Sequence, residues 1–244
     1  MDDRALHDLQ SAVGAVRGPG ADPDAALARA GTAIVVRDGA AGPEVLMMHR
    51  PERGSFAGAW VFPGGRVEPV DEVAGAEPID DARRAAARET AEEVGMVVDA
   101  EHLVPISRWD PPVGIPKRIR TWFYLARAGA GELTLSTDEV VEALWVRPED
   151  ALQRHARGEL TLYPPTWVTL QGLAGHATGD AMLAAAAGRG IHVFATNLRR
   201  DADATVFVWR PDAAYDPAVP LEAPGARHRL VTAALPWQYI VTPG

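Results

Sequence analysis

Three glutamates with helical spacing are the residues of this sequence best suited to chemistry. Glu89, Glu92 and Glu93 lie in the run ArgGluThrAlaGluGluValGlyMet at positions 88–96. In a helix, spacings of three and four residues place all three carboxylates on one face. Repulsion between such like charges costs about 0.2–0.5 kcal/mol per pair, and Arg88 can offset part of it. A divalent cation that prefers oxygen ligands, such as Mg²⁺ or Mn²⁺, would offset much more.

A glycine-rich turn ahead of this helix favours a bound ligand over the alternative explanation, a solvated acidic face. Taken alone, a cluster of charges on a helix is most often such a face. Here the apolar run TrpValPhe (60–62) stops at Pro63, Gly64 and Gly65. Because glycine has no Cβ, the backbone there can approach a ligand closely, and a free carbonyl oxygen can serve as a further ligand.

The turn and the helix together resemble the Nudix box, the signature of the Nudix hydrolase superfamily. In that family a glycine is followed by five residues, Glu, seven residues and then Arg-Glu-aliphatic-x-Glu-Glu-x-Gly-aliphatic. The residues of this chain that match the pattern are Gly65, Arg88, Glu89, Glu92, Glu93, Gly95 and Met96. The resemblance covers about residues 31–175.

The box departs from the family pattern in two places. Thr90 occupies an aliphatic position, where its methyl group can still pack. The first glutamate of the pattern falls on Asp71 when counted from Gly65 and on Asp80 when counted back from Arg88. The loop therefore carries an insertion of about nine residues, and either aspartate can be the partner of Arg88. Such an insertion costs little entropy, so the helix should be intact.

The flanking segments resemble the coenzyme A diphosphatase-like branch of the superfamily. That branch also tends to carry an insertion inside the box. The segments that carry this likeness are MetMetHisArgPro (47–51), SerPheAlaGlyAlaTrpValPheProGlyGlyArgValGlu (55–68), ArgTrpAspProPro (108–112) and ArgThrTrpPheTyrLeuAla (120–126).

The resemblance implies an α+β enzyme with the Nudix fold, a mixed β-sheet sandwiched between α-helices. Its members cleave a nucleoside diphosphate linked to another group, by attack of water on one phosphorus with the help of metal ions. It implies that Glu89, Glu92 and Glu93 are metal ligands, assisted by the Gly65 carbonyl. It also implies that Arg88 orients these carboxylates.

One acidic residue outside the box is a candidate for the catalytic base, which in some relatives lies outside it. Glu139, together with Asp138, opens the run AspGluValValGluAlaLeuTrpVal (138–146). A solvated loop acid is the alternative for Glu139. We take it as a candidate catalytic residue beside the glutamates of the box.

Arginines near the expected site suit a diphosphate substrate, because guanidinium groups match phosphate oxygens. Trp122 and Tyr124 alternate on one face of a predicted strand, with Phe123 on the other face. Trp122 is a candidate for stacking on a base, and burial in the core is the alternative. The candidate arginines are Arg50, Arg53, Arg66, Arg118 and Arg120.

The composition excludes several other kinds of function. The 244 residues include no cysteine and carry a net charge of -9, which rules out thiolate chemistry and makes duplex DNA a poor partner. The one lysine, Lys117, follows no glycine run, so a P-loop is excluded. The histidines show no zinc-binding spacing. With neither a signal peptide nor a membrane-spanning window, we expect a cytoplasmic protein without nucleic-acid or membrane partners.

Strand and helix signals mix without regular βαβ alternation, which agrees with an α+β fold. Asp80 or Asp81 is expected to cap the box helix, and Gly95 to end it. The acidic residues 72–79 are expected to form a surface excursion that tolerates shortening. Predicted helices cover 1–17, 81–94, a segment from 148, 165–174 and 180–188. Predicted strands cover 32–37, 44–49, 60–62, 102–109, 119–127, 140–146, 191–196, 204–209 and 229–241.

These signals divide the chain into an N-terminal helix and linker (1–30), a Nudix hydrolase domain (31–175) and a C-terminal α/β extension (176–244). Large apolar patches are rare on soluble monomers, so the extension must be covered by the core or by a dimer interface. We expect a homodimer, because Nudix relatives are often homodimers.

The predicted function is hydrolysis of a nucleoside-diphosphate-linked small molecule, with coenzyme A or acyl-CoA as candidate substrates and Mg²⁺ or Mn²⁺ as cofactor. The alternatives are an ADP-sugar or dinucleotide diphosphatase, and a non-catalytic Nudix-fold binding or regulatory module. Because the box keeps Arg88 and all three of its glutamates, the enzyme is favoured over the module.

Overall fold

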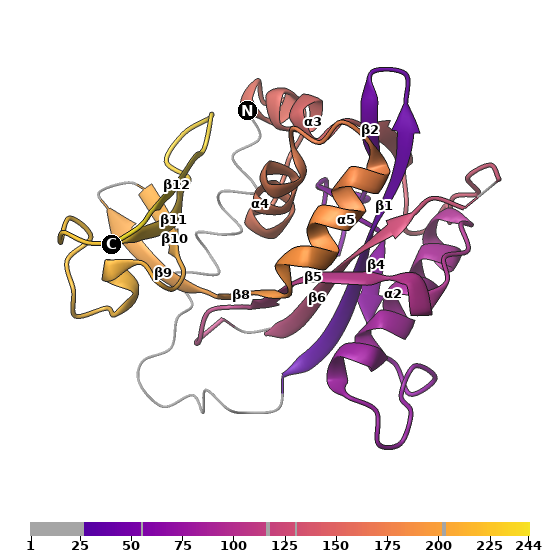
Figure 1. The fold of residues 1–244 in the computed structure, drawn as a ribbon, viewed down its shortest axis with the longest axis horizontal. Coiled ribbons are helices and arrows are strands. Elements are labelled where there is room, and N and C mark those ends of the chain that lie inside the picture. The colour runs from indigo at the N-terminus through magenta and orange to yellow at the C-terminus, as the bar shows by residue number, and fades with distance from the viewer. Residues whose placement is uncertain (1–26, 55, 116–117, 130, 202–203) are drawn as a thin grey trace.

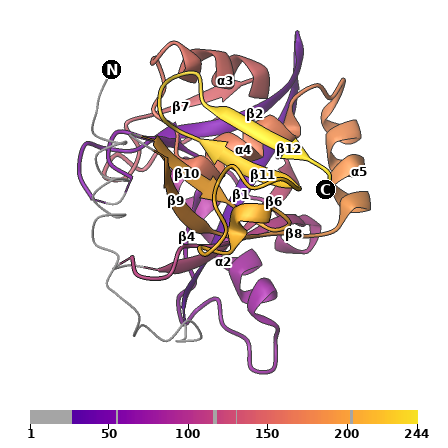
Figure 2. The same cartoon turned by 90° about the vertical axis from the view of Figure 1, so that its left-hand side faces the viewer.

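Two β-sheets organise the structure (Figures 1 and 2). The helix predicted for residues 1–17 lies outside the described part of the chain. The computed structural model describes residues 27–54, 56–115, 118–129, 131–201 and 204–244.

The larger sheet has eight strands and is mixed. It consists of β1 (Ala28–Gly39), β2 (Gly42–His49), β3 (Trp60–Val61), β4 (Gly64–Arg66), β5 (Val104–Asp110), β6 (Ile119–Arg127), β7 (Glu142–Val146) and β8 (His192–Ala195). Their order is β3-β2-β1-β6-β5-β8, with β4 beside β1 and β7 beside β2. The β1–β6 and β5–β8 pairs are parallel, and the other pairs are antiparallel.

Helices cover both faces of this sheet (Figure 1). α2 (Pro78–Val94) packs on one face, and α3 (Pro148–Ala156), α4 (Pro164–Leu173) and α5 (Gly179–Arg189) pack on the other. This arrangement confirms the predicted α+β class and the mixed sheet between helices. None of the helices in the described ranges has the length and apolar character needed to span a bilayer.

Alternating side chains of the central strands build the two apolar layers. On β6, Trp122 and Tyr124 pack toward α2, whereas Phe123 packs into the opposite layer. On β1, Ala33 and Ile34 divide in the same way. The alternation predicted for β6 is therefore confirmed, and it follows from the two-residue repeat of a strand.

Helix α2 begins earlier than the sequence pattern predicted. Its first residue is Pro78, and Glu77 before it makes no capping hydrogen bond through its side chain. Proline suits this position because the first helical N–H needs no partner. The prediction of Asp80 or Asp81 as the cap is therefore wrong. Both lie in the first turn, and Asp81 is buried in an ion pair.

The insertion in the box is a surface excursion over only part of the predicted range 72–79. Its last two residues belong to α2, where the Ile79 carbonyl accepts a hydrogen bond of 2.5 Å from the Tyr124 hydroxyl. The Val73 amide donates to the buried carboxylate of Asp81 at 3.3 Å. The exposed residues that can be deleted without losing either contact lie between Val73 and the start of α2.

Deletion of residues 74–76 is expected to leave stability nearly unchanged, with a shift in Tm of less than about 4 °C. The comparison variant is Asp81→Ala, which removes the partner shared by Arg29 and Arg84. Because it removes the buried counter-charge of two partly exposed arginines, it is expected to destabilise the fold by about 1–3 kcal/mol. Thermal unfolding of both variants checks the prediction, and equal losses would contradict it.

Residues 176–244 complete the large sheet and then form a second one. After α5, β8 pairs in parallel with β5. The smaller sheet contains β9 (Asn197–Asp201), β10 (Ala204–Val208), β11 (Arg227–Val231) and β12 (Gln238–Thr242), all antiparallel in the order β12-β11-β10-β9 (Figure 2). β9 was not predicted, and the single run predicted at 229–241 is two strands.

The extension shares one apolar core with the α3–α4–α5 face of the large sheet. The Phe194 ring stacks on Trp109 with centroids 3.9 Å apart, and Trp209 meets Trp109 edge-on at 5.7 Å. Trp237 contacts Trp167 of α4 at 6.2 Å. The sequence predicted that the apolar residues of the extension are buried either against the chain's own core or in a dimer interface. The structure shows them packed against the chain's own core.

Candidate active site

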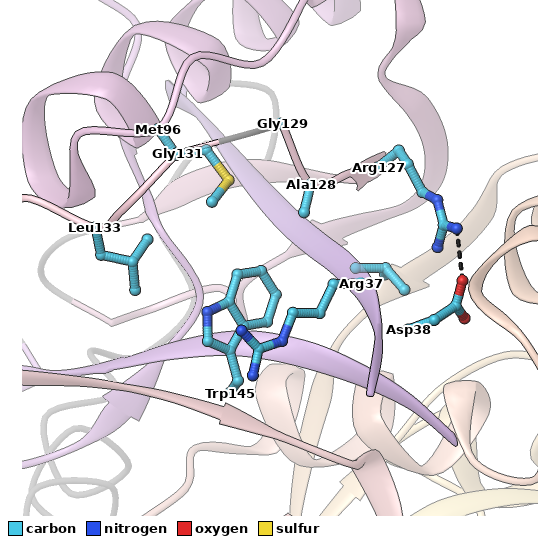
Figure 3. Close-up of a pocket in the computed structure, with 10 residues that line it drawn as sticks. Arg37, Asp38, Met96, Arg127, Ala128, Gly129, Gly131, Leu133 and Trp145 are labelled. Atoms are coloured by element: carbon cyan, nitrogen blue, oxygen red, sulfur yellow. Dashed lines mark hydrogen bonds and ion pairs between the residues drawn. The ribbon is translucent and has the colours of Figure 1, made fainter. Parts of the chain in front are cut away.

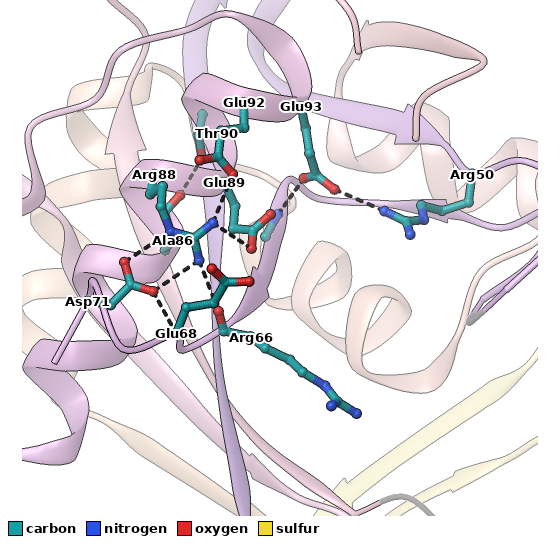
Figure 4. A network of polar contacts seen from close by, with 11 residues as sticks. Arg50, Arg66, Glu68, Asp71, Ala86, Arg88, Glu89, Thr90, Glu92 and Glu93 are labelled. Carbon is teal, nitrogen blue, oxygen red and sulfur yellow. Dashed lines mark hydrogen bonds and ion pairs between the residues drawn. The ribbon is translucent and has the colours of Figure 1, made fainter. Parts of the chain in front are cut away.

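Three carboxylates from two elements converge beside the C-terminal half of α2. One oxygen each of Glu89, Glu93 and Glu139 lies within 4.8 Å of the others. Figure 4 shows the Glu89 and Glu93 side chains projecting from α2, with Arg50 beyond Glu93. Glu139 lies on the loop before β7. This donor set contains only hard oxygen ligands, which are those that Mg²⁺ and Mn²⁺ prefer.

Glu93 is the most deeply buried carboxylate of the cluster, with 1% of the residue exposed. Its Oε2 accepts a hydrogen bond from the Gly64 amide at 2.9 Å, and its Oε1 pairs with Arg50 Nη1 at 2.9 Å. Burial raises the pKa of Glu93 to about 8, although these two contacts oppose the rise. The site therefore holds a carboxylate in a position where counter-charge is needed.

Glu89 lies against the glycine turn that the sequence singled out. A Cβ atom on Gly65 would overlap the Glu89 carboxylate, so a larger residue there would displace this side chain. Arg88 Nη1 pairs with Glu89 Oε1 at 3.0 Å. Burial raises the pKa of Glu89, with the charge of Arg88 acting in the opposite direction.

Backbone hydrogen bonds from residues 134 and 136 to the end of α2 bring the loop with Glu139 to the cluster. The Ser136 amide donates to the Glu93 carbonyl at 2.9 Å, and the Glu139 amide donates to the Ser136 carbonyl at 3.1 Å. Gly95 ends α2 in the left-handed conformation with φ of 71°, as predicted. The loop is thereby fixed against the helix, although Glu139 itself is exposed.

Arg88 joins the insertion to the carboxylates. Its Nε and Nη2 donate to the two oxygens of Asp71 at 3.1 and 3.0 Å, and its Nη2 also donates to the Arg66 carbonyl at 3.0 Å. Of the two positions that the sequence left open, Asp71 is therefore the partner. Asp80 instead pairs with Arg83 at 3.2 Å.

Asp71→Asn is expected to weaken activation by metal, because residues that orient metal ligands typically contribute about 10–100-fold to metal affinity. The Mg²⁺ concentration at half-maximal activity should rise by about that factor. Asp80→Asn is the matched control and should leave it unchanged. Titration of activity with Mg²⁺ makes the measurement, and the opposite ranking would show that Asp80 positions Arg88.

Two other residues of the box, Glu92 and Thr90, lie outside the carboxylate cluster. Glu92 is exposed and pairs with Arg88 Nη1 at 2.8 Å rather than joining Glu89, Glu93 and Glu139. Thr90, at the aliphatic position, is buried, and its hydroxyl donates to the Ala86 carbonyl at 2.7 Å. A hydroxyl can therefore replace an aliphatic group here because the helix backbone satisfies it.

The structure brings two of the five predicted arginines to the cluster. Arg50 pairs with Glu93, and Arg53 Nη2 donates to the Asp138 carbonyl at 3.4 Å, one residue before Glu139. The other three make different contacts. The Arg66 side chain points away from the carboxylates in Figure 4, Arg118 donates to the Pro111 carbonyl at 3.1 Å, and Arg120 pairs with Asp110 at 2.5 Å.

The prediction of Trp122 as a base-stacking surface is wrong. Only 6% of the residue is exposed, and it packs with Tyr124 and the α2 residues Ala82 and Ala86. A ring held in this layer has no free face for a ligand. The alternative stated from the sequence, burial in the core, is the one that the structure shows.

A cavity of about 370 Å³ lies apart from these carboxylates, at the far ends of β1 and β6 (Figure 3). Its two arginines already have partners. Arg37 lies over the Trp145 ring at 4.4 Å, and Arg127 pairs with Asp38 at 2.5 Å. The cavity therefore offers little free positive charge to a phosphate, and the carboxylate cluster remains the candidate active site.

Comparison with known proteins agrees with this geometry. Residues 27–165 match the family described as NUDIX domain. The CTP pyrophosphohydrolase of Escherichia coli (strain K12) is 33% identical over 121 residues, which is 50% of this chain and 76% of that protein. The crystal structure of a NUDIX hydrolase from Alicyclobacillus acidocaldarius aligns with a TM-score of 0.58 at 26% identity, covering 66% of this chain and 97% of that one.

The fold, the carboxylate-bearing helix and these matches define a pyrophosphohydrolase. The chain belongs to the Nudix family, with the box helix at α2 and the glycine turn at β4.

Two contacts of the site were missed from the sequence. The first is the Gly64 amide, which donates a hydrogen bond to Glu93. Arg50 was assigned to substrate, but it contacts Glu93 directly. The adjoining glycines were a usable signal for the first contact. No local pattern links Arg50 to a residue 43 positions away.

Proposed function

We propose that this Nudix enzyme is a metal-dependent diphosphatase that cleaves the diphosphate bond of a nucleoside diphosphate linked to another group. The observation that carries the proposal is the convergence of Glu89, Glu93 and Glu139 beside Arg88, which Asp71 restrains. Only oxygen donors are present, and they fit Mg²⁺ or Mn²⁺. When bound, the cation would polarise the phosphoryl oxygens and lower the pKa of a water molecule.

The roles of the side chains follow from burial and contacts. Glu89 and Glu93 are the proposed metal ligands from α2, because their carboxylate oxygens lie in the cluster. The Gly65 carbonyl and Glu92 are further proposed ligands on the family resemblance alone, since Glu92 pairs with Arg88 outside the cluster. Glu139 is exposed and has no helix to hold it, so it is the proposed base that accepts a proton from the attacking water.

The arginines of the 50–58 loop are proposed to contact the substrate phosphates. Arg53 is exposed, and its hydrogen bond to the Asp138 carbonyl at 3.4 Å uses one of the five N–H donors of a guanidinium group. Arg50 bridges Glu93 and the loop, so it can neutralise charge on both the protein and the phosphate. Arg66 and Arg120 remain proposed only as peripheral contacts, because their side chains are directed elsewhere.

Two substrate classes have specific support. The flanking segments resemble the coenzyme A diphosphatase-like branch, which favours coenzyme A or acyl-CoA. The relative with 33% identity is a CTP pyrophosphohydrolase, which favours a nucleoside triphosphate cleaved to a monophosphate and pyrophosphate. Both reactions need the same cluster and break a phosphoanhydride bond. ADP-sugars and dinucleotides remain in the same class.

A substrate panel distinguishes these classes. Coenzyme A, acetyl-CoA, ADP-ribose, a diadenosine polyphosphate and CTP are incubated with Mg²⁺ or Mn²⁺, and the products are identified by mass spectrometry. Hydrolysis at a diphosphate bond that stops in excess chelator is the expected result. Undiminished turnover in chelator, or no turnover of any member, would overturn the proposal.

A homodimer, a cytoplasmic location and a boundary at residue 175 stay predictions. The dimer rests on the frequency of homodimers among Nudix relatives. Because the extension packs on its own core, a dimer would use another surface. Light scattering on the intact chain measures the mass, and a monomer would contradict the dimer.

A further inference from the structure

Phe56 is an exposed aromatic residue on the loop that also carries Arg50 and Arg53. It is 53% exposed, and it is the only aromatic among the large apolar residues that are exposed in the described ranges. Its ring meets Tyr163 edge-on with centroids 4.9 Å apart. This contact uses one side of the residue and leaves more than half of its surface open to solvent.

The backbone of Phe56 is also in an unfavourable conformation. Its φ is 58°, and no other non-glycine residue in the described part of the chain has a positive φ. The same loop places glycines at Gly54 and Gly58, with φ of 80° and 66°, where the conformation costs little. A bulky side chain at such a position is a genuine outlier, and residues held in this way cluster at ligand-binding sites.

The loop that carries Phe56 is tied to both sides of the carboxylate cluster. Its ends are closed by the Arg50 amide, which donates to the Ala59 carbonyl at 2.9 Å, and by the Gly58 amide, which donates to the Pro51 carbonyl at 3.2 Å. From this loop Arg50 reaches Glu93 at 2.9 Å, and Arg53 reaches the backbone next to Glu139. An open aromatic ring and two guanidinium groups therefore lie on one short loop beside the carboxylates.

We propose that Phe56 is a specificity-determining residue that stacks on the nucleobase of the substrate while Arg50, Arg53 and the carboxylate cluster engage its phosphates. The inference rests on the proposed function, because it assigns the base-recognising part of the same site. Any nucleobase has a flat face that an aromatic ring can cover, so the contact selects base-bearing diphosphates over those without a base. It also explains why the ring stays exposed in a strained conformation.

The kinetic test compares Phe56→Ala, Phe56→Gly and Phe56→Trp with the full chain, using ADP-ribose and Mg²⁺. Loss of the ring is expected to raise KM about tenfold with kcat within about twofold, and tryptophan should restore KM. The glycine variant relaxes the backbone, yet it should match the alanine variant because both lack the ring. Val241→Ala, an exposed position on β12, is the control and should change neither constant.

The binding test does not depend on turnover. AMP and ribose 5-phosphate differ only in the base, and each is titrated onto the protein by calorimetry in the presence of Mg²⁺. The wild-type chain is expected to bind AMP about tenfold more tightly, and Phe56→Ala should remove that difference.

The outcomes separate this inference from the proposed function. If ADP-ribose is hydrolysed but Phe56→Ala keeps both KM and the preference for AMP, the inference is overturned and the proposed function stands. If no diphosphate is hydrolysed but the AMP preference depends on Phe56, the proposed function is overturned and the inference stands. A wild-type chain without preference for AMP, or a Phe56→Ala variant that changes only the oligomeric state, overturns the inference.

Discussion

Glu93→Gln is expected to lower kcat by roughly a thousandfold or more, because a bound cation stabilises transition-state charge by several kcal/mol and each 1.4 kcal/mol is a factor of ten. The fold should survive the change. Glutamine keeps the shape of the side chain and the acceptor for the Gly64 amide, and it removes a charge whose burial is unfavourable. The measurement is steady-state hydrolysis together with thermal unfolding.

The matched control for this variant is Asp80→Asn, which makes the same kind of change on the same helix. Asp80 pairs with Arg83 near the surface and is not part of the cluster. Its activity should stay within about twofold of the wild-type value. The ligand role of Glu93 fails if Glu93→Gln keeps wild-type turnover, or if both variants lose activity to the same extent.

Trp209→Ala is expected to lower the free energy of unfolding by about 3–5 kcal/mol, the usual cost of removing a buried tryptophan side chain. Trp209 is fully buried between the two sheets. Its ring centroid lies 5.7 Å from that of Trp109 and 5.4 Å from that of Phe194. Its indole N–H also donates to Thr196 at 3.0 Å. Urea unfolding measures the change, with Val241→Ala as an exposed control in the same extension.

A truncation that ends at residue 175 removes all of the packing between the extension and the core. It removes α5 and β8 from the large sheet and exposes the aromatic rings on which they pack. The shortened chain should aggregate, because an open strand edge beside exposed apolar surface is an association site. A truncated protein that stays soluble and active would show that the extension is dispensable.

The parts of the structure that depend on local sequence were predictable. The three- and four-residue spacing of the box glutamates, Gly95 at the helix end and the two-residue alternation on β6 each follow from neighbouring residues. The family pattern added the strand–turn–helix context. β9 was missed because its run AsnLeuArgArgAsp has one apolar residue, and it is a strand through its pairing with β10.

The parts that depend on contacts between distant segments were not predictable from spacing. Counting residues left Asp71 and Asp80 equal as partners of Arg88, and only the path of the loop distinguishes them. Arg50 follows β2 and Glu93 lies on α2, so their ion pair forms between residues 43 positions apart that no spacing rule connects. Trp122 had two interpretations because alternation tells which face a residue is on, not whether that face is covered.

The parallel pairing of β8 with β5 has a consequence for synthesis of the protein on the ribosome. The carboxylates, the glycine turn and the apolar layer that faces α2 come from residues that emerge before residue 175. The large sheet nevertheless stays open at β5 until residues 192–195 have left the exit tunnel. Contacts between such distant segments form slowly, so the nascent chain presents an unpaired strand edge during this interval. The large sheet of the enzyme can therefore be completed only after β8 has been translated.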